Sequence, residues 1–341
     1  MKKKIVLSAV IPTHNSAKTI NNLLQSINQS KFNNFKNIEV VVVDDRSDDQ
    51  TVRIIKNTRP TLKFPIILIE SNRKIGPAKA RNLGVDKSSG KYVLFLDSDI
   101  ILMKHTLKNA FSMAKEAKIK AFTGIWDWHQ KTDKFFPQFK ALRDWSYWTL
   151  ERKKNHRYYL FSTRIAGIDK KLFKTVGKFN ENYGGPTVED IELTYKIEKA
   201  AKIEFSPKLI VQHEFEDFPI IAKKYFLRTR DWVHLYLKRY RFDPVATTEK
   251  EAIKPFILNF FLFFLVSLFV TRHIFTLFAS ILTLVIYLIL EIRLIIFLYQ
   301  KKGLLFAAKS VPTAMILYII IEIGALYGFI SYFFISRNSK D

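Results

Sequence analysis

The chain has 341 residues, enough for one large domain or two moderate ones. Its formal charge of +24 and its isoelectric point near 9.9 indicate a polyanionic partner: nucleic acid, anionic lipid or a phosphorylated metabolite. The absence of cysteine excludes disulfides, thiolate metal sites and cysteine nucleophiles. Only seven apolar-leaning residues separate Met-Lys-Lys-Lys from Pro12, which is too short for a signal peptide and typical of a first strand.

The first hundred residues alternate between predicted strands and predicted helices. Ser47 and Gln50 have the spacing of a capping box for the second helix. The alternation β-α-β-α-β-α-β predicts an α/β fold with a mostly parallel sheet and helices on both faces. The predicted strands cover 5–11, 38–43, 66–69 and 92–96, and the predicted helices begin at Ser16, after Asp49 and at Gly76-Pro77.

The predicted strand 92–96 is followed by two carboxylates, Asp97 and Asp99. Residues two apart in a strand point the same way, and α/β sheets bind ligands at the carboxyl ends of their strands. Two hard oxygen ligands in so basic a chain favour Mg²⁺ or Mn²⁺ carrying a phosphate-bearing substrate. The alternative is that Asp-Ser-Asp caps the following helix.

The middle of the chain has a weaker pattern. Residues 121–126 are a predicted strand, whereas 126–161 mix aromatic with basic residues and have no clean period. That segment suits stacking on a sugar ring, contact with lipid headgroups, or packing on the sheet. A Gly-Gly-Pro-Thr sequence then precedes a predicted helix, and short strands are predicted near 203–205 and 209–212. The aromatic residues of the segment are Trp126, Trp128, Trp145, Tyr147 and Trp148.

Residues 220–254 contain nine Lys or Arg against four Asp or Glu. Within them, 221–242 form a basic amphipathic pattern with aromatic residues along one face. Because an apolar region follows directly, this pattern predicts an interfacial helix on anionic lipid. The alternative is an ordinary solvated surface helix.

The last third of the chain contains apolar blocks at 255–271, 274–298 and 311–335, which predict about three transmembrane helices. A spanning helix needs about 20 apolar residues, with a floor of roughly 17, so the first block is at the limit and Glu291 and Arg293 interrupt the second. Lys301, Lys302 and Lys309 fall in the predicted loop before the third block. The positive-inside rule then places this loop and the N-terminal domain in the cytoplasm and the C-terminus outside, as a multi-pass protein of the cell membrane. A re-entrant pair is the alternative for the first two blocks.

Six motifs, in order and with family-like spacing, resemble those of an inverting family 2 glycosyltransferase. The resemblance covers residues 5 to about 215. It implies a GT-A-type nucleotide-sugar-binding domain over 1–219. The charge and hydropathy patterns add an interfacial region over 220–254 and a transmembrane region over 255–336. The resemblance also implies a UDP- or GDP-sugar donor and a Mg²⁺ or Mn²⁺ ion. The motifs are Pro12-Thr-His-Asn15, Val43-Asp44-Asp45-Arg-Ser47-Asp48, Ala80-Arg81-Asn82-Leu-Gly84, Gly90-Lys-Tyr-Val-Leu-Phe-Leu-Asp97-Ser-Asp99, Glu189-Asp190-Ile-Glu-Leu193 and Pro207-Lys-Leu-Ile-Val-Gln-His213-Glu.

The resemblance implies roles for the donor side of the site. Pro12 and His14 match the turn that packs against the nucleotide base, and Asp45, with Asp44 beside it, matches the carboxylate that binds the base. Either aspartate has a helix cap as its alternative role. Arg81 either holds this loop or approaches the diphosphate, and its alternative is a plain surface arginine.

The same resemblance implies the metal ligands. Asp99 is the first choice, and Asp97 either coordinates the cation directly or faces the ribose. The cation would neutralise the departing diphosphate as a Lewis acid. His213 matches a position that often supplies a further ligand, although a single histidine is usually structural.

Asp190, with Glu189 beside it, is the candidate catalytic pair on the acceptor side. An attacking hydroxyl must lose its proton, and Asp190 can take it as a general base. The alternative is a pair of acids that cap the following helix. A polyprenyl phosphate is already anionic and needs no base, so the pair favours a hydroxyl of a lipid-linked or cell-envelope glycan.

Two departures from the family pattern and four rival functions bear on this prediction. Glu192 stands where many relatives carry Asp, and the Gln-x-x-Arg-Trp signature of processive members is missing, so one sugar per encounter is expected. The chain has no glycine-rich, lysine-containing phosphate loop near its N-terminus, which argues against a nucleotidyltransferase, and it has neither a dinucleotide glycine fingerprint nor a P-loop. The apolar blocks argue against a nucleic-acid-binding module. A polyprenyl-phosphate glycosyltransferase and an inactive membrane scaffold with a GT-A domain stay open as alternatives.

Overall fold

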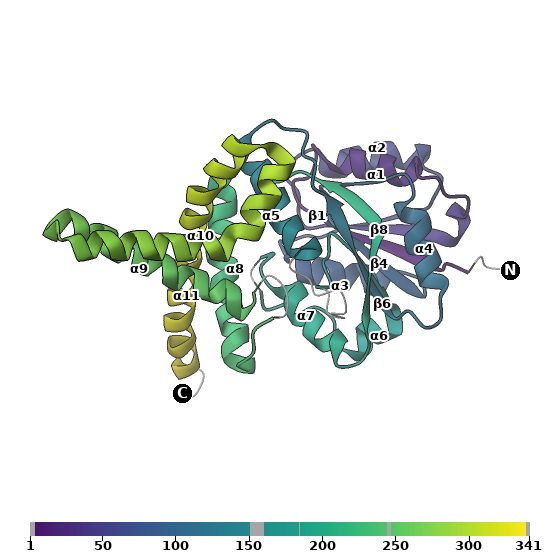
Figure 1. The fold of residues 1–341 in the computed structure, drawn as a ribbon. Coiled ribbons are helices and arrows are strands. Elements are labelled where there is room, and N and C mark those ends of the chain that lie inside the picture. Colours follow the sequence, from purple (N-terminus) through teal and green to yellow (C-terminus); the bar gives the residue numbers. More distant parts are fainter. Residues whose placement is uncertain (1–3, 151–159, 184, 244–246, 339–341) are drawn as a thin grey trace. The chain divides into compact units, whose positions relative to one another are not determined.

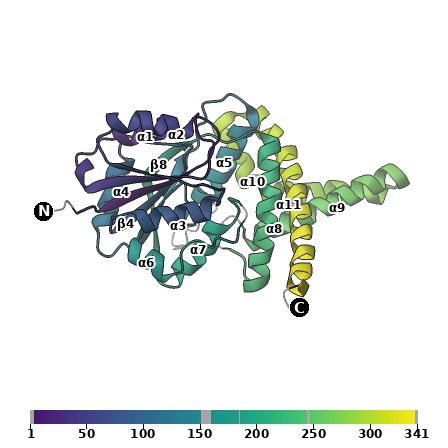
Figure 2. The same cartoon turned by 180° about the vertical axis from the view of Figure 1, so that it is seen from behind.

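The computed structural model describes residues 4–150, 160–183, 185–243 and 247–338 (Figures 1 and 2). The chain divides into two compact units. One contains residues 1–131 and 157–214, and the other contains residues 132–156 and 215–341. In the described residues the first unit is an α/β unit and the second is built of helices alone.

The α/β unit is built on an eight-stranded sheet with the order β3-β2-β1-β4-β7-β6-β8-β5. The strands β3, β2, β1 and β4 run parallel to one another. β7 is antiparallel to β4 and to β6, β8 is parallel to β6, and β5 is antiparallel to β8. The strands are β1 (Leu7–Thr13), β2 (Ile38–Asp44), β3 (Ile66–Glu70), β4 (Tyr92–Leu96), β5 (Ile100–Leu102), β6 (Ala121–Asp127), β7 (Ile165–Asp169) and β8 (Ile203–His213).

The sheet is therefore mixed. The prediction of parallel strands is right for the half formed by β3, β2, β1 and β4. It also holds for β6 and β8, which run in the same direction as these four strands, whereas β7, which the sequence analysis missed, and β5 run in the opposite direction. The strands predicted at 203–205 and 209–212 form the single strand β8, whose interruption appears as a register shift opposite Thr123 and Ile125.

The parallel half forms the core of this unit because helices cover it from both sides. The side chains of β2 from Val40 to Val43 and those of β4 are fully buried, as expected for central parallel strands. Helices α1 and α2 lie on one face and α3 on the other (Figures 1 and 2). Gly84 lets α3 approach β1 closely, since a Cβ there would lie 2.5 Å from Val10 Cγ1. The helices are α1 (Ile20–Asn28), α2 (Thr51–Thr58), α3 (Pro77–Lys87), α4 (Thr106–Lys115), α6 (Lys170–Thr175) and α7 (Glu189–Glu198), with short 3₁₀ turns at Phe35–Asn37 and Arg59–Thr61.

The helical unit contains α5 (Phe135–Thr149), α8 (Phe218–Arg239), α9 (Glu249–Thr271), α10 (Ile274–Lys302) and α11 (Leu304–Asn338). By length and composition, α9, α10 and α11 are three helices that can cross a membrane. Only Gly303, with φ +83°, separates α10 from α11. The prediction of a loop containing Lys301, Lys302 and Lys309 is therefore wrong, because all three lie within helices.

Charged and small residues join the helices of this unit. Glu291 is 3% exposed and contacts Lys254 Nζ of α9 at 3.1 Å and the Tyr318 hydroxyl of α11 at 2.8 Å. Helix α8 packs along α11, where a Cβ on Gly324 or Gly328 would lie 2.7 Å from a backbone oxygen of α8. The segment predicted as an interfacial helix thus has one side against the third apolar helix.

The aromatic segment after β6 mostly packs within its own unit. Trp126 is 3% exposed in the α/β unit. In the helical unit, Trp148 is buried on α5 and Trp145 stacks on Phe297 of α10. Packing was one of the three interpretations of this segment. The residues 151–159 of the segment lie outside the described residues.

Candidate functional site

The turns that follow β1 and β2 lie side by side at the carboxyl edge of the sheet. The two strands pair in register up to Thr13 and Asp44, and Pro12 pairs with Val43. His14 Nδ1 lies 2.8 Å from the backbone oxygen of Asp45. The turns are joined by the Asn15 amide, which donates to Ser47 Oγ at 2.9 Å.

The two adjacent aspartates bind different parts of the backbone. Asp44 accepts hydrogen bonds from the amide and hydroxyl of Ser47 at 2.9 and 2.5 Å. Ser47 therefore stabilises the turn after β2, and the predicted capping box with Gln50 is wrong because the cap of α2 makes no side-chain hydrogen bond. Asp45 accepts from the amides of Ile75 and Gly76 at 2.5 and 2.9 Å, which fixes the loop before α3. Both aspartates are buried.

Arg81 joins the end of β4 to the beginning of α7. Its guanidinium donates to Asp97 Oδ1 at 2.8 Å and to Glu189 Oε1 at 3.1 Å, and its side chain is 5% exposed. Burial opposes the charge of Arg81, but the carboxylates of Asp97 and Glu189 outweigh burial and raise the pKa of Arg81. These contacts hold the end of β4 against the start of α7, and the burial of the side chain contradicts the alternative of a plain surface arginine.

Asp99 and His213 form the second pair at this edge. The pairing of Ile100 with His213 brings them together, and His213 Nε2 lies 3.5 Å from Asp99 Oδ2. The surrounding protein atoms oppose the ionisation of Asp99, but His213 and then Arg164 outweigh them and lower its pKa to about 2. Asp99 is therefore an anion at neutral pH, although 49% of its side chain is exposed.

This pair fits a divalent cation as a partial donor set. Mg²⁺ is typically held by one or two carboxylates together with substrate phosphates and water, and Mn²⁺ accepts both oxygen and imidazole ligands. Within the described ranges, no group of three or more His, Asp or Glu residues is arranged to hold a metal by itself. The carboxylate of Asp97 is 26% exposed and shares one oxygen with Arg81.

The carboxylates at the start of α7 differ in their surroundings. Glu189 is 3% exposed and, besides Arg81, accepts from the Thr187 amide at 2.8 Å. Asp190 is partly exposed, and its backbone oxygen accepts from the Thr194 hydroxyl at 2.7 Å. Asp190 is therefore the more accessible of the two.

Glu192, the residue that differs from many family members, serves the loop before α7. It accepts from Asn180 Nδ2 at 2.9 Å and from the Tyr183 hydroxyl at 2.8 Å, and it pairs with Lys196 at 2.8 Å. These contacts connect α7 to the segment that follows α6.

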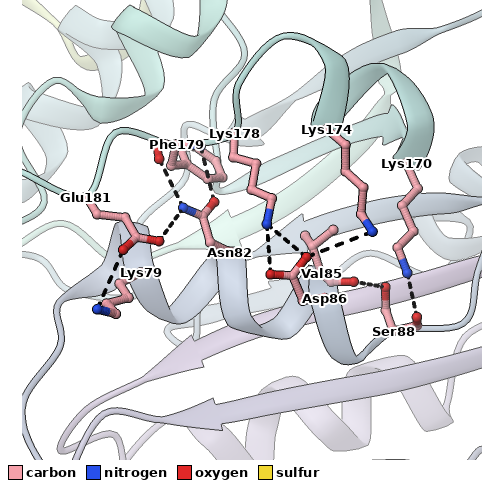
Figure 3. A network of polar contacts seen from close by, with 10 residues as sticks. All are labelled: Lys79, Asn82, Val85, Asp86, Ser88, Lys170, Lys174, Lys178, Phe179 and Glu181. Atoms are coloured by element: carbon pink, nitrogen blue, oxygen red, sulfur yellow. Dashed lines mark hydrogen bonds and ion pairs between the residues drawn. The ribbon is translucent and has the colours of Figure 1, made fainter.

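Asn82, one residue after Arg81, has a positioning role that the sequence analysis did not assign. Figure 3 shows its amide clamped on the backbone of Phe179: it donates to the oxygen at 3.0 Å and accepts from the amide at 3.1 Å. It also donates to Glu181 at 2.9 Å. Asp86, one turn further along α3, pairs with Lys178 at 2.8 Å. One face of α3 thus fixes the segment leading to Glu189, and the Arg-Asn pair in the motif was the only sequence signal.

Comparison of the sequence with known proteins identifies the family of the α/β unit. The Glycosyl transferase family 2 model matches residues 8–177. The poly(ribitol-phosphate) beta-N-acetylglucosaminyltransferase TarS of Staphylococcus aureus is 32% identical over 189 residues, which cover 51% of this chain and 33% of TarS. The GalNAc(5)-diNAcBac-PP-undecaprenol beta-1,3-glucosyltransferase of Campylobacter jejuni is 31% identical over 116 residues, covering 34% of this chain and 37% of the relative. The matches thus span only about a third of these relatives.

Solved structures show the same fold. The mannosyltransferase PcManGT of Pyrobaculum calidifontis, in complex with GDP-Man and Mn²⁺, has a TM-score of 0.57 and 18% identity, covering 96% of this chain and 87% of that one. S. aureus TarS 1–349 in complex with UDP-GlcNAc has a TM-score of 0.51 and 21% identity, covering 93% and 90%. The α/β unit therefore has a GT-A-like fold. The chain carries a glycosyltransferase family 2 domain, as its motifs indicated, followed by three helices that can span a membrane.

Proposed function

We propose that the chain is a membrane-bound, inverting glycosyltransferase that moves one sugar from a UDP- or GDP-sugar to a hydroxyl of a lipid-linked or cell-envelope glycan. The observation that carries the proposal is the bridge made by Arg81. It fixes the strand end bearing Asp97 and Asp99 against the helix that begins with Glu189 and Asp190. A donor-side and an acceptor-side carboxylate would thereby share one site, as transfer between two substrates requires.

The donor nucleotide is assigned to the turns after β1 and β2. Pro12 and His14 would pack against the base, and Asp45, supported by Asp44, would accept a hydrogen bond from it. The oxygens of Asp45 each receive one backbone amide, and a carboxylate oxygen has a second lone pair for such a bond. The complexes of the structural neighbours with UDP-GlcNAc and GDP-Man support a nucleotide-sugar donor.

The cation is assigned to Asp99 and His213, with Asp97 as a further ligand or as the residue facing the ribose. A Mg²⁺ or Mn²⁺ ion bound there supplies a Lewis acid that stabilises the negative charge on the leaving diphosphate. The complex of PcManGT with Mn²⁺ supports this assignment.

Asp190 is assigned as the general base, and Glu189 as the residue that holds the start of α7 on Arg81. The acceptor oxygen attacks the anomeric carbon, the bond from that carbon to the diphosphate oxygen breaks, and its electrons leave with the diphosphate. Asp190 takes the hydroxyl proton. Attack on the face opposite the leaving group inverts the anomeric configuration.

The experiment is transfer and donor hydrolysis by the detergent-purified full chain, with UDP- and GDP-sugars in the presence of Mn²⁺. Replacement Asp190→Asn removes the base and keeps the volume, so we expect kcat to fall about 10²- to 10⁴-fold while nucleotide affinity is retained. Glu198→Gln, at an exposed position of the same helix, is the matched control. Full transfer by Asp190→Asn would refute the assignment of the base.

The acceptor is assigned to the membrane surface. The three apolar helices anchor the chain, and basic residues of α8 would contact anionic lipid on the cytoplasmic side. The relatives' names point to the same class of acceptor, since one acts on poly(ribitol-phosphate) and another on an undecaprenol-linked glycan.

A further inference from the structure

Arg164 lies at the same end of the sheet as Asp97 and Asp99, the two aspartates that follow β4, although no motif contains it. Strand β7 is antiparallel to β4, and their pairing ends at Leu96 and Ile165. The next residues along this ladder are Asp97 on one side and Arg164 on the other. The direction of β7, which the sequence analysis missed, is what brings this cation to the site.

The guanidinium of Arg164 is seated on an aromatic ring. Its central carbon lies 4.8 Å from the ring centroid of Trp126, and the ring itself is only 3% exposed. A guanidinium over an indole face is attracted by the ring and keeps its donors in one plane. Arg164 is itself partly exposed.

The turn that carries Arg164 is fixed to the helix of the candidate base. The Ile165 amide closes the turn on the Ser162 oxygen at 3.1 Å. The Phe161 amide donates to the Thr194 hydroxyl at 2.9 Å, and that hydroxyl donates to the backbone oxygen of Asp190 at 2.7 Å. Hydrogen bonds therefore join the turn that carries Arg164 to the start of α7.

We propose that Arg164, seated on Trp126, binds a phosphate group of a substrate. Arg81 is not available for this role, because it is buried between Asp97 and Glu189. The phosphate belongs either to the diphosphate of the donor or to a phosphate carried by the acceptor. A fixed arginine suits either source, since its planar donors match phosphate oxygens in pairs. The inference rests on the proposed function, because it requires phosphate-bearing substrates at this edge.

The test of the first source compares UDP and GDP with uridine and guanosine, by calorimetry on the detergent-purified chain with Mn²⁺. In Arg164→Gln we expect diphosphate affinity to fall about tenfold or more and nucleoside affinity to stay unchanged. Arg164→Lys keeps the positive charge but cannot donate two parallel hydrogen bonds to a phosphate, so we expect a smaller loss of diphosphate affinity. Arg53→Gln, an exposed arginine on α2, is the matched control.

The second source is tested with ribitol 5-phosphate against ribitol, each added to the chain saturated with the nucleotide that binds. If the acceptor supplies the phosphate, we expect Arg164→Gln to lower the affinity for ribitol 5-phosphate about tenfold or more and to leave the affinities for ribitol and for the nucleotide unchanged. Trp126→Phe keeps an aromatic ring under the guanidinium, so we expect the affinity for either phosphate probe to change less than about threefold. Trp126→Leu removes the ring, so we expect it to lower the affinity for the same phosphate probe that Arg164→Gln affects.

Unchanged affinity for both phosphate probes in Arg164→Gln would overturn the proposal. So would an equal loss for the probes with and without phosphate, because that result reports general damage to the site. A wild-type chain that binds neither nucleoside nor diphosphate would instead refute the proposed function itself, and the role of Arg164 with it.

Discussion

Some carboxylates at the edge of the sheet bind groups of the protein itself, and others are exposed to solvent. Asp44, Asp45 and Glu189 are buried and hold backbone amides or Arg81, whereas Asp99 is half exposed. Removing one partner of a buried ion pair leaves an unpaired charge and typically costs 3–5 kcal/mol. Substitution of the buried acids therefore alters folding as well as chemistry, which makes Asp99 and Asp190 better residues for testing function.

The contacts of Glu192 predict how the stability of the protein depends on pH. Burial raises its pKa, but hydrogen bonds from Lys196, Asn180 and Tyr183 outweigh burial and lower its pKa below the ordinary value. The stabilisation is thus present above the unfolded glutamate pKa, about 4.3, and is lost as the pH falls through the lower folded value. We expect Glu192→Gln to unfold more easily than wild type at pH 7, by about 1–3 kcal/mol, and the difference to shrink below pH about 4.

Thermal unfolding of both proteins across this pH range measures the effect. Glu204→Gln removes a partly exposed pair with Lys202 and is expected to cost less than about 1 kcal/mol. A difference between wild type and Glu192→Gln that grows toward acid pH would contradict the prediction.

Single residues also mark the limit of what the sequence predicts about the site. Asp97 and Asp99 were expected at a strand end because their spacing follows a buried apolar run, and the structure has them there. Arg164 carries no such local signal. Its place depends on the direction in which β7 enters the sheet, and that depends on pairing between segments far apart in the sequence.

At the scale of elements, the predicted strands and helices of the first hundred residues are confirmed, because each has a regular apolar period and a turn signal at its end. Helix α5 was missed because its aromatic and basic residues follow no single period and pack on other helices of the second unit. β7 was missed because it has only five residues, one of them glycine. Tertiary packing, rather than local preference, decides such segments.

The close packing of α8 on α11 predicts that a larger side chain at Gly328 destabilises the helical unit. Gly328→Leu would place side-chain atoms where the backbone oxygen of Arg230 lies 2.7 Å from a Cβ, so α8 must move away. We expect a lower melting temperature in detergent, equivalent to about 1–3 kcal/mol. Ala308→Leu, at an exposed position of α11, adds the same bulk as a control. Equal melting temperatures for the two variants would show that the helices do not pack through Gly328.

At the scale of the whole molecule, the chain combines a glycosyltransferase family 2 domain with three helices that can span a membrane. The basic residues Lys301 and Lys302 end α10, whereas Arg272 and His273 join α9 to α10. With three spans and the family 2 domain in the cytoplasm, the first junction faces outward and the second faces inward.

This topology is directly testable because the chain has no cysteine of its own. We expect a membrane-impermeant maleimide to label Arg272→Cys in intact cells, and to label Lys302→Cys only after the cells are permeabilised. Labelling of both positions from the same side would instead indicate a re-entrant pair, and labelling in the opposite order would invert the orientation.

The single-residue connection at Gly303 has a consequence for biogenesis. A helix rises about 1.5 Å per residue, so α10, with 29 residues, is about 44 Å long, more than the bilayer core of about 30 Å. One glycine cannot extend into water as a loop between two such helices. We therefore expect α10 and α11 to enter the bilayer together as one hairpin.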